Sequence, residues 1–406
     1  MKKKRWERIQ PRLHYAGAHV EAFSAWLEAR GYADRTIRTL SGLLARFVEW
    51  SASRGYGLDG LDRALAAAVL DRNRRGGSRR DRPATEALGA GRLFARFLRE
   101  TGILPSQARK PTPTDRWPRL AAFRQWMHDH RGVRDSSLDL WQRHLDALLT
   151  QCGDDPAAYT AASVRDFVLR RAETGGRSRA RCVTCAVRSY LRFLEAHGLC
   201  ATDLQHAVPR FADWRLSSVP KYLPAADVER IIEACSGPHR LRDRAIVLLL
   251  ARLGLRASDV AGLRLNDIDW RQGRLAVNGK ERRAQWLPLT QEIGDAILAY
   301  LRIRVETRHG AALFLTIQAP RQPITRITVK CIVKRAIARA GVRSPSQGAH
   351  VLRHSAATAM LRSGASLDAI GAVLRHRSPA TTLLYAKVDL PTLAQLARPW
   401  VGRRPC

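Results

Sequence analysis

Six side chains in the C-terminal half of the sequence have the types and the order needed to break a phosphodiester bond without a metal ion. They are Arg256, Lys280, His350, Arg353, His376 and Tyr385. The phenolic oxygen of Tyr385 could attack phosphorus and leave a covalent phosphotyrosine, which conserves the bond energy for rejoining. The guanidinium groups of Arg256 and Arg353 match the nonbridging oxygens on which negative charge accumulates. The set predicts metal-independent phosphoryl transfer.

Lysine and histidine would supply the proton chemistry. Lys280 directly follows Asn278 and Gly279, a strong turn signal, and a lysine on a turn could protonate the departing 5′ oxygen. His350 precedes Arg353 by one helical turn, so both could address one phosphate. No carboxylate or cysteine stands at ligand spacing beside the histidines, so we predict neither a metal site nor a cofactor. Each residue alone has an ordinary explanation, such as a core tyrosine or a solvated lysine, and only the set favours catalysis.

The motifs that contain these residues resemble those of the tyrosine recombinases, the family of phage integrases and Xer-type resolvases. The motifs are Gly254-Leu255-Arg256-Ala257-Ser258-Asp259, His350-Val351-Leu352-Arg353-His354 and Leu374-Arg375-His376-Arg377-Ser378, followed by Tyr385. The resemblance implies that His350 assists proton transfer at Tyr385, that His376 donates to a nonbridging oxygen, and that His354 is structural. Family members usually have Glu where this chain has Asp259, and the resemblance gives that carboxylate a supporting role in orienting His350 and the arginines.

The charge of the chain indicates a polyanionic partner. Of its 406 residues, 70 are Lys or Arg and 36 are Asp or Glu, which gives a net charge of +34. The excess is spread among apolar periodic segments instead of a basic tail, and apolar residues make up 45% of the chain, which excludes wholesale disorder. The apolar stretch Ala245–Ala251 is too short to span a membrane, and the seven scattered cysteines do not suggest a disulfide framework. We therefore expect a cytoplasmic protein that binds double-stranded DNA.

The N-terminal half contains an internal duplication. Phe23-Ser24-Ala25-Trp26-Leu27 recurs as Phe123-Arg124-Gln125-Trp126-Met127, and Phe94-Ala95-Arg96-Phe97-Leu98 recurs as Tyr190-Leu191-Arg192-Phe193-Leu194. A basic Gly-Gly loop precedes the second string of each copy. Because glycine allows close backbone approach and arginine binds phosphate, the loop arginines are candidate DNA contacts. They are Arg74, Arg75, Arg79 and Arg80 in the first copy, and Arg177 and Arg179 in the second.

Proline-rich segments around Pro105–Pro118 and Pro209–Pro224 divide the chain. We expect a helical DNA-binding domain at 1–105, a second helical domain with linkers at 106–222, and a catalytic domain at 223–406. A hairpin is predicted at Leu275–Val277 and Gln285–Pro288. The fold class is mainly α with a small β-sheet. The resemblance implies two SAM-like core-binding domains, one more than is usual, before an α+β tyrosine-recombinase catalytic domain.

Two shorter patterns have competing interpretations. Cys182-Val183-Thr184-Cys185 could be half of a metal site or a redox pair, but it falls in a helical pattern without a second pair, which favours two small apolar residues on one helix face. The leucine pattern at Leu390, Leu393, Leu396 and Ala397 predicts an amphipathic helix. It could pack on its own domain, whereas the resemblance implies docking on a neighbouring protomer.

The resemblance implies cleavage and rejoining of DNA strands at specific sites by a homo-tetramer on synapsed DNA, with a dimer at each site and the question of accessory proteins open. The long N-terminal region is typical of transposons and integrative elements. Two alternatives stay open: a type IB topoisomerase that relaxes supercoils as a monomer, and a catalytically silent DNA-binding regulator of the same fold.

Overall fold

The computed structural model describes residues 10–73, 85–106, 111–211, 219–278, 284–305, 310–376, 378–388 and 393–394. Within these ranges the chain is mainly helical with one three-stranded antiparallel sheet, which confirms the predicted fold class. Buried apolar side chains gather into one core in each helical repeat and two further clusters after residue 222. Of the predicted DNA contacts, Arg74, Arg75, Arg79 and Arg80 lie outside the described residues, as does most of the predicted C-terminal helix. No helix in the described part of the chain is long and apolar enough to cross a membrane.

The first helical segment packs around the aromatic residues of the repeated strings. Phe23 meets the ring of Phe94 edge-on at 5.3 Å between centroids and also contacts Phe97. Gly91 lets helices α2 and α4 approach closely, because a Cβ atom there would lie 2.7 Å from the ring of Phe47. The helices are α1 (Val20–Glu28), α2 (Asp34–Ala52), α3 (Leu61–Asn73) and α4 (Thr85–Glu100).

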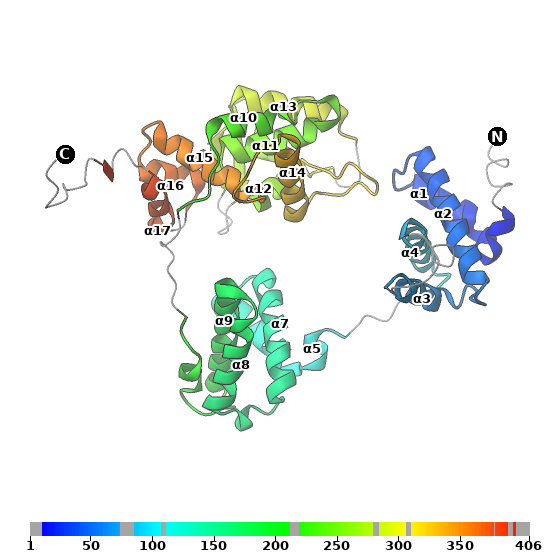
Figure 1. Cartoon of the computed structure of the whole chain (residues 1–406), viewed down its shortest axis with the longest axis horizontal. Coiled ribbons are helices and arrows are strands. Elements are labelled where there is room, and N and C mark those ends of the chain that lie inside the picture. The colour runs from blue at the N-terminus through cyan, green and yellow to red at the C-terminus, as the bar shows by residue number, and fades with distance from the viewer. Residues whose placement is uncertain are drawn as a thin grey trace, which may run out of the picture. The chain divides into compact units, whose positions relative to one another are not determined.

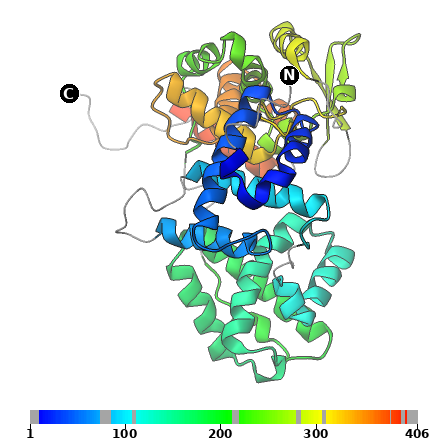
Figure 2. The same cartoon turned by 90° about the vertical axis from the view of Figure 1, so that its right-hand side faces the viewer.

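The second helical segment repeats this aromatic packing. Phe123 meets the ring of Tyr190 edge-on, again at 5.3 Å, and contacts Phe193. The duplication seen in the sequence therefore extends to the geometry of the core. Helices α7, α8 and α9 run side by side in both views (Figures 1 and 2). The helices are α5 (Pro113–Arg116), α6 (Pro118–Arg131), α7 (Asp135–Cys152), α8 (Ala161–Glu173) and α9 (Gly176–Ala196).

One expectation for this segment was wrong. Arg177 and Arg179 were expected on a loop, but they lie in the first turn of α9, which begins at Gly176. Gly176 has a φ of +65°, a conformation that favours glycine, so the Gly-Gly pair forms a compact turn into the helix instead of a longer loop. Cys182 and Cys185 lie on the same helix as free thiols, with Cys185 exposed.

The remaining described residues form a helical body with a sheet at its side. Helix α11 is buried along most of its length and packs against α13 and α15. The predicted hairpin is present as β2 and β3, with Ala276 paired to Trp286, and a short strand β1 adds a third member (Figure 2). The elements are α10 (Ala225–Glu233), α11 (Leu241–Arg252), α12 (Ala257–Gly262), β1 (Ile268–Asp269), β2 (Arg274–Asn278), β3 (Ala284–Pro288), α13 (Gln291–Ile303), α14 (Arg326–Arg339), α15 (His350–Arg362), α16 (Leu367–Leu374), α17 (Pro379–Thr382) and the 3-10 helix η9 (Leu383–Val388).

Candidate active site

The fold brings five of the six predicted catalytic residues together from four places in the chain. Arg256 lies at the N-terminus of α12, His350 and Arg353 on α15, His376 between α16 and α17, and Tyr385 on η9. Arg353 and Arg256 bind the neighbouring carbonyls of Leu374 and Arg375, and the ring of His376 stacks on that of Tyr385. The sixth residue, Lys280, lies outside the described residues, in the segment that joins β2 to β3.

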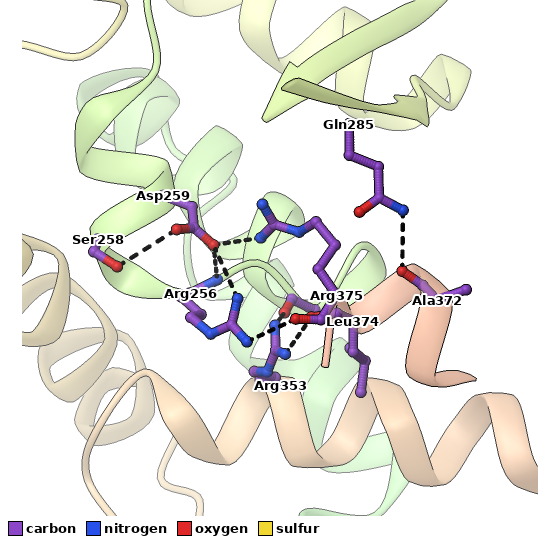
Figure 3. A network of polar contacts seen from close by, with 9 residues as sticks. Arg256, Ser258, Asp259, Gln285, Arg353, Ala372, Leu374 and Arg375 are labelled. Atoms are coloured by element: carbon purple, nitrogen blue, oxygen red, sulfur yellow. Dashed lines mark hydrogen bonds and ion pairs between the residues drawn. The ribbon is translucent and has the colours of Figure 1, made fainter. Parts of the chain in front are cut away.

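Arg353 is a buried guanidinium fixed by two backbone carbonyls. Its side chain donates through Nη1 to the carbonyl of Gly254 and through Nη2 to that of Leu374 (Figure 3). Gly254 has a φ of +60°, and a Cβ atom there would lie 2.4 Å from the Cδ2 atom of Leu374, so the position strongly favours glycine. The residue is 2% exposed, and its pKa is lowered to about 10, mainly by burial and then by Arg256.

Arg256 is more accessible and approaches the same backbone. Its Nη2 donates to the carbonyl of Arg375 at 3.0 Å, and 38% of its side chain is exposed. The two candidate catalytic arginines therefore bind consecutive carbonyls, those of Leu374 and Arg375, at the end of α16 (Figure 3). This arrangement fixes their guanidinium groups relative to each other while one stays open to solvent.

Asp259 contacts arginines, not histidines. Its carboxylate forms an ion pair with Arg375, accepts from the backbone N–H of Arg256 at 3.2 Å and lies 3.9 Å from Nη1 of Arg256 (Figure 3). Asp259 was expected to orient the arginines, and its contacts with Arg256 are compatible with that role. Among the described residues, Asp259 makes no contact with His350. Its main partner, Arg375, was not predicted from the sequence.

The Tyr385 hydroxyl lies against a histidine that was expected to be structural. The Nδ1 atom of His354 is 2.9 Å from the hydroxyl oxygen, and Tyr385 is only 2% exposed. The ring of His376 stacks on that of Tyr385 at 6.2 Å between centroids, with an angle of 2° between the ring planes. His350 packs edge-on against His354 at 4.4 Å between ring centroids, so its ring contacts His354, which in turn contacts the Tyr385 hydroxyl.

The pKa values of His350, His354 and His376 all lie below the ordinary value of a histidine. Burial, followed by the charge of neighbouring groups, lowers the pKa of His354 and of His376 to about 4 and also lowers that of His350. Burial raises the pKa of Tyr385. A neutral imidazole has one nitrogen that can accept a hydrogen bond, and His354 can therefore accept from the Tyr385 hydroxyl when its proton is on Nε2. His376 uses Nδ1 to contact Thr382 Oγ1 at 2.8 Å, which leaves Nε2 for a ligand.

Sequence reasoning missed three features of this site. These are the contact of His354 with the nucleophile, the buried side chain of Arg375, and Thr382 as the partner of His376. Arg375 is part of the motif Leu374–Ser378, but in a chain with 70 basic residues nothing in the sequence distinguishes it from the other arginines. In the described part of the chain no group of three or more His, Cys, Asp or Glu side chains could hold a metal ion.

A basic surface also lies on α9 in the second helical segment. Its arginines line an open groove of about 910 Å³ together with Trp141 and Phe211. They are Arg181, Arg188 and Arg192, joined by Arg131 and Arg210 from outside the helix. The candidates Arg177 and Arg179 lie on the same helix but do not line the groove.

Comparisons with a family profile, with curated proteins and with solved structures all find integrases and recombinases. Residues 221–390 match the profile described as "Phage integrase family". A protein of Sinorhizobium fredii named as an integrase/recombinase, y4rA, is 36% identical over 95% of this chain and 94% of its own. The tyrosine recombinase XerC of Azotobacter vinelandii is 30% identical over 70% of this chain and 97% of its own. The Tn1549 transposon integrase, solved in complex with circular intermediate DNA, shares the fold, with a TM-score of 0.53 and 15% identity over 69% of this chain and 99% of that one.

Proposed function

Because this chain belongs to the phage integrase family of tyrosine recombinases, we propose that it cleaves and rejoins DNA strands through a covalent 3′-phosphotyrosine at Tyr385. Site-specific recombination is the activity of this family. The observation that carries the proposal is the contact between the Tyr385 hydroxyl and the neutral imidazole of His354, within a cluster that also contains buried guanidinium groups.

The first chemical step needs a nucleophile and an acceptor for its proton. Tyr385 Oη attacks phosphorus, the O–P bond forms, and the proton passes to Nδ1 of His354. Burial, then His350 and then the positive charge of Arg353 lower the pKa of His354. A phosphate bound beside Arg353 offsets that positive charge, so substrate binding makes the imidazole a stronger base. In the rejoining step the same histidine returns the proton to the tyrosyl oxygen.

The arginines stabilise the charge that accumulates on phosphorus. Arg353 and Arg256 are held by adjacent carbonyls, so their remaining N–H groups are oriented before the substrate arrives. His376 adds a donor through Nε2, because its Nδ1 is already engaged by Thr382. Preorganised donors in a site of low exposure lower the barrier without further rearrangement.

The leaving 5′ oxygen needs a proton as its bond to phosphorus breaks. We assign this role to Lys280 on its type and its place after the β2 strand; the side chain itself lies outside the described residues. In each strand cleavage, His354 takes one proton from Tyr385 and Lys280 gives one proton to the leaving 5′ oxygen. The total number of protons on the enzyme and its DNA is therefore unchanged. No water or metal is consumed, and the reaction can run backwards with a new 5′ hydroxyl.

Double-stranded DNA is the proposed partner, and the α9 groove is a second contact surface. Its arginines are close enough to influence one another: burial and then Arg210 and Arg192 lower the pKa of Arg188. A row of guanidiniums beside Trp141 suits a phosphate backbone, because each phosphate neutralised releases condensed counterions. By family analogy, synapsis of two sites would bring four protomers together.

The similarity across the first helical segment favours a mobile-element role. The match to y4rA covers 95% of this chain, whereas XerC is matched over 97% of its own length but only 70% of this chain. The chain therefore has more sequence than a XerC-type recombinase uses, as predicted for an integrase or transposase of a mobile element. The likeness to a transposon integrase points the same way.

One experiment separates recombinase, topoisomerase and silent regulator. A binding site is selected from a pool of random duplexes, and two duplexes carrying it are incubated with the full chain. Exchange of strands between labelled duplexes supports recombination. Relaxation of a supercoiled plasmid without exchange would indicate a topoisomerase. Binding with neither reaction, and no covalent adduct on nicked duplexes, would show a silent regulator and refute the proposal.

A further inference from the structure

Arg375 has a backbone conformation that is unfavourable for a residue with a Cβ atom. It follows the last residue of α16 with φ 55° and ψ 55°, in the left-handed region. This turn directs two consecutive carbonyls, those of Leu374 and Arg375, at the guanidinium groups of Arg353 and Arg256. The turn therefore positions both catalytic arginines, but it does not explain why the side chain at this position is itself an arginine.

The side chain of Arg375 is buried with unused hydrogen-bond donors. It is 6% exposed, and Nη2 forms an ion pair with Asp259, which is 12% exposed. Nε and Nη1 are also buried and have no hydrogen-bond partner. Unpaired N–H groups of a buried cation are costly, so they call for a ligand. Arg375 also lines a cavity of about 310 Å³ together with His376 and Thr382.

The charges around Arg375 do not balance in the free protein. Two guanidinium groups, those of Arg256 and Arg375, lie beside the carboxylate of Asp259, and the charge of Arg353 acts on the same cluster. Burial, then the charge of Arg256 and also that of Arg375, lower the pKa of Arg353. A phosphodiester brings one negative charge, and the pentacovalent species formed by tyrosine attack brings a second. Around Asp259 the described guanidinium groups outnumber the carboxylates, and an anionic phosphate would offset part of that excess.

We propose that Arg375 is a third phosphate-binding guanidinium of the active site, held by Asp259 so that Nε and Nη1 are reserved for an oxygen of the scissile DNA phosphate. The inference rests on the proposed strand cleavage. Asp259 is then a positioning residue, which explains why its carboxylate contacts arginines and not His350.

The left-handed backbone allows a clean test. Arg375→Gly removes the guanidinium and at the same time relieves the strained conformation, so loss of folding is not expected. Arg375→Asn, which also tolerates this conformation, is the matched control that keeps a side chain. We expect both variants to retain duplex binding and to lose about 10²-fold in single-turnover cleavage of a nicked duplex, the effect of removing one preorganised donor.

A second substrate distinguishes charge stabilisation from structural support. A methylphosphonate at the scissile position lacks one anionic oxygen, so the deficit of Arg375→Gly relative to the wild type should shrink on it. A purely structural role for the Arg375–Asp259 pair would give the same deficit on both substrates and would overturn the inference. Cleavage by Arg375→Gly at the wild-type rate would also overturn it. If the wild type forms no adduct on the phosphate substrate, the proposed strand cleavage fails instead.

Discussion

The Nδ1 atom of His354 lies 2.9 Å from the hydroxyl oxygen of Tyr385, although the two residues come from different elements, α15 and η9. His350, the histidine that family resemblance makes the proton carrier, contacts the ring of His354 instead. The proposed nucleophile, Tyr385, is therefore buried and already hydrogen-bonded to a potential base. This relationship makes His354 the residue whose substitution is most informative.

Replacing His354 by glutamine should impair cleavage more than binding. Glutamine keeps a polar group near Tyr385 but cannot take its proton, and loss of a general base typically costs 10²- to 10⁴-fold, so we expect a loss on the order of 10²-fold or more. Single-turnover cleavage and duplex affinity are measured together. His350→Gln is the matched control, and a larger loss in this control than in His354→Gln would return the role of base to His350.

Acid should destabilise the protein through the same histidines. The pKa of His354 and of His376 is about 4, against an ordinary value of 6.5. Between these values the unfolded chain binds protons that the folded chain does not, so the free energy of unfolding falls as the pH falls from 6.5 to 4. The double variant His354→Gln/His376→Gln should show a shallower fall in the thermal midpoint. An identical pH dependence in both proteins would contradict the depressed pKa values.

Arg353→Lys should fail to restore cleavage despite its charge. A lysine has one ammonium nitrogen and cannot reach both the Gly254 and the Leu374 carbonyl in the geometry of the planar guanidinium. We expect a loss of about 10²-fold or more in the cleavage rate, with duplex binding nearly unchanged. Cleavage rates close to those of the wild type would show that the two carbonyl contacts do not position the group.

Lys280→Ala should be rescued by a substrate whose leaving group needs no proton. A bridging 5′-phosphorothiolate departs as a thiolate, so a variant that lacks only the general acid should recover on it. Arg353→Ala serves as the control, because its defect in phosphate stabilisation should persist. Equal recovery of the two variants would remove Lys280 from the role of acid.

Local patterns in the sequence predicted the helical repeats and the hairpin, and they supplied the candidate catalytic side chains, whose roles stay predictions. Phe23 and Phe123 occupy equivalent positions in two similar cores because the apolar spacing of both copies is the same. The contact between His354 and Tyr385 depends on how η9 packs on α15, and no local pattern encodes that packing. Arg375 was missed for another reason: its significance comes from burial and unpaired donors, which a sequence rich in arginine does not reveal.

The most direct test of the proposed function is covalent capture of DNA by Tyr385. A nicked duplex that traps the cleaved strand is incubated with the wild type and with Tyr385→Phe, and the adduct is digested and mapped by mass spectrometry. The variant loses one hydroxyl and no phosphate-binding charge, so it should bind the duplex like the wild type and form no adduct. The account predicts a wild-type adduct on the peptide that contains Tyr385. An adduct that persists in Tyr385→Phe, or one that maps to another residue, would contradict it.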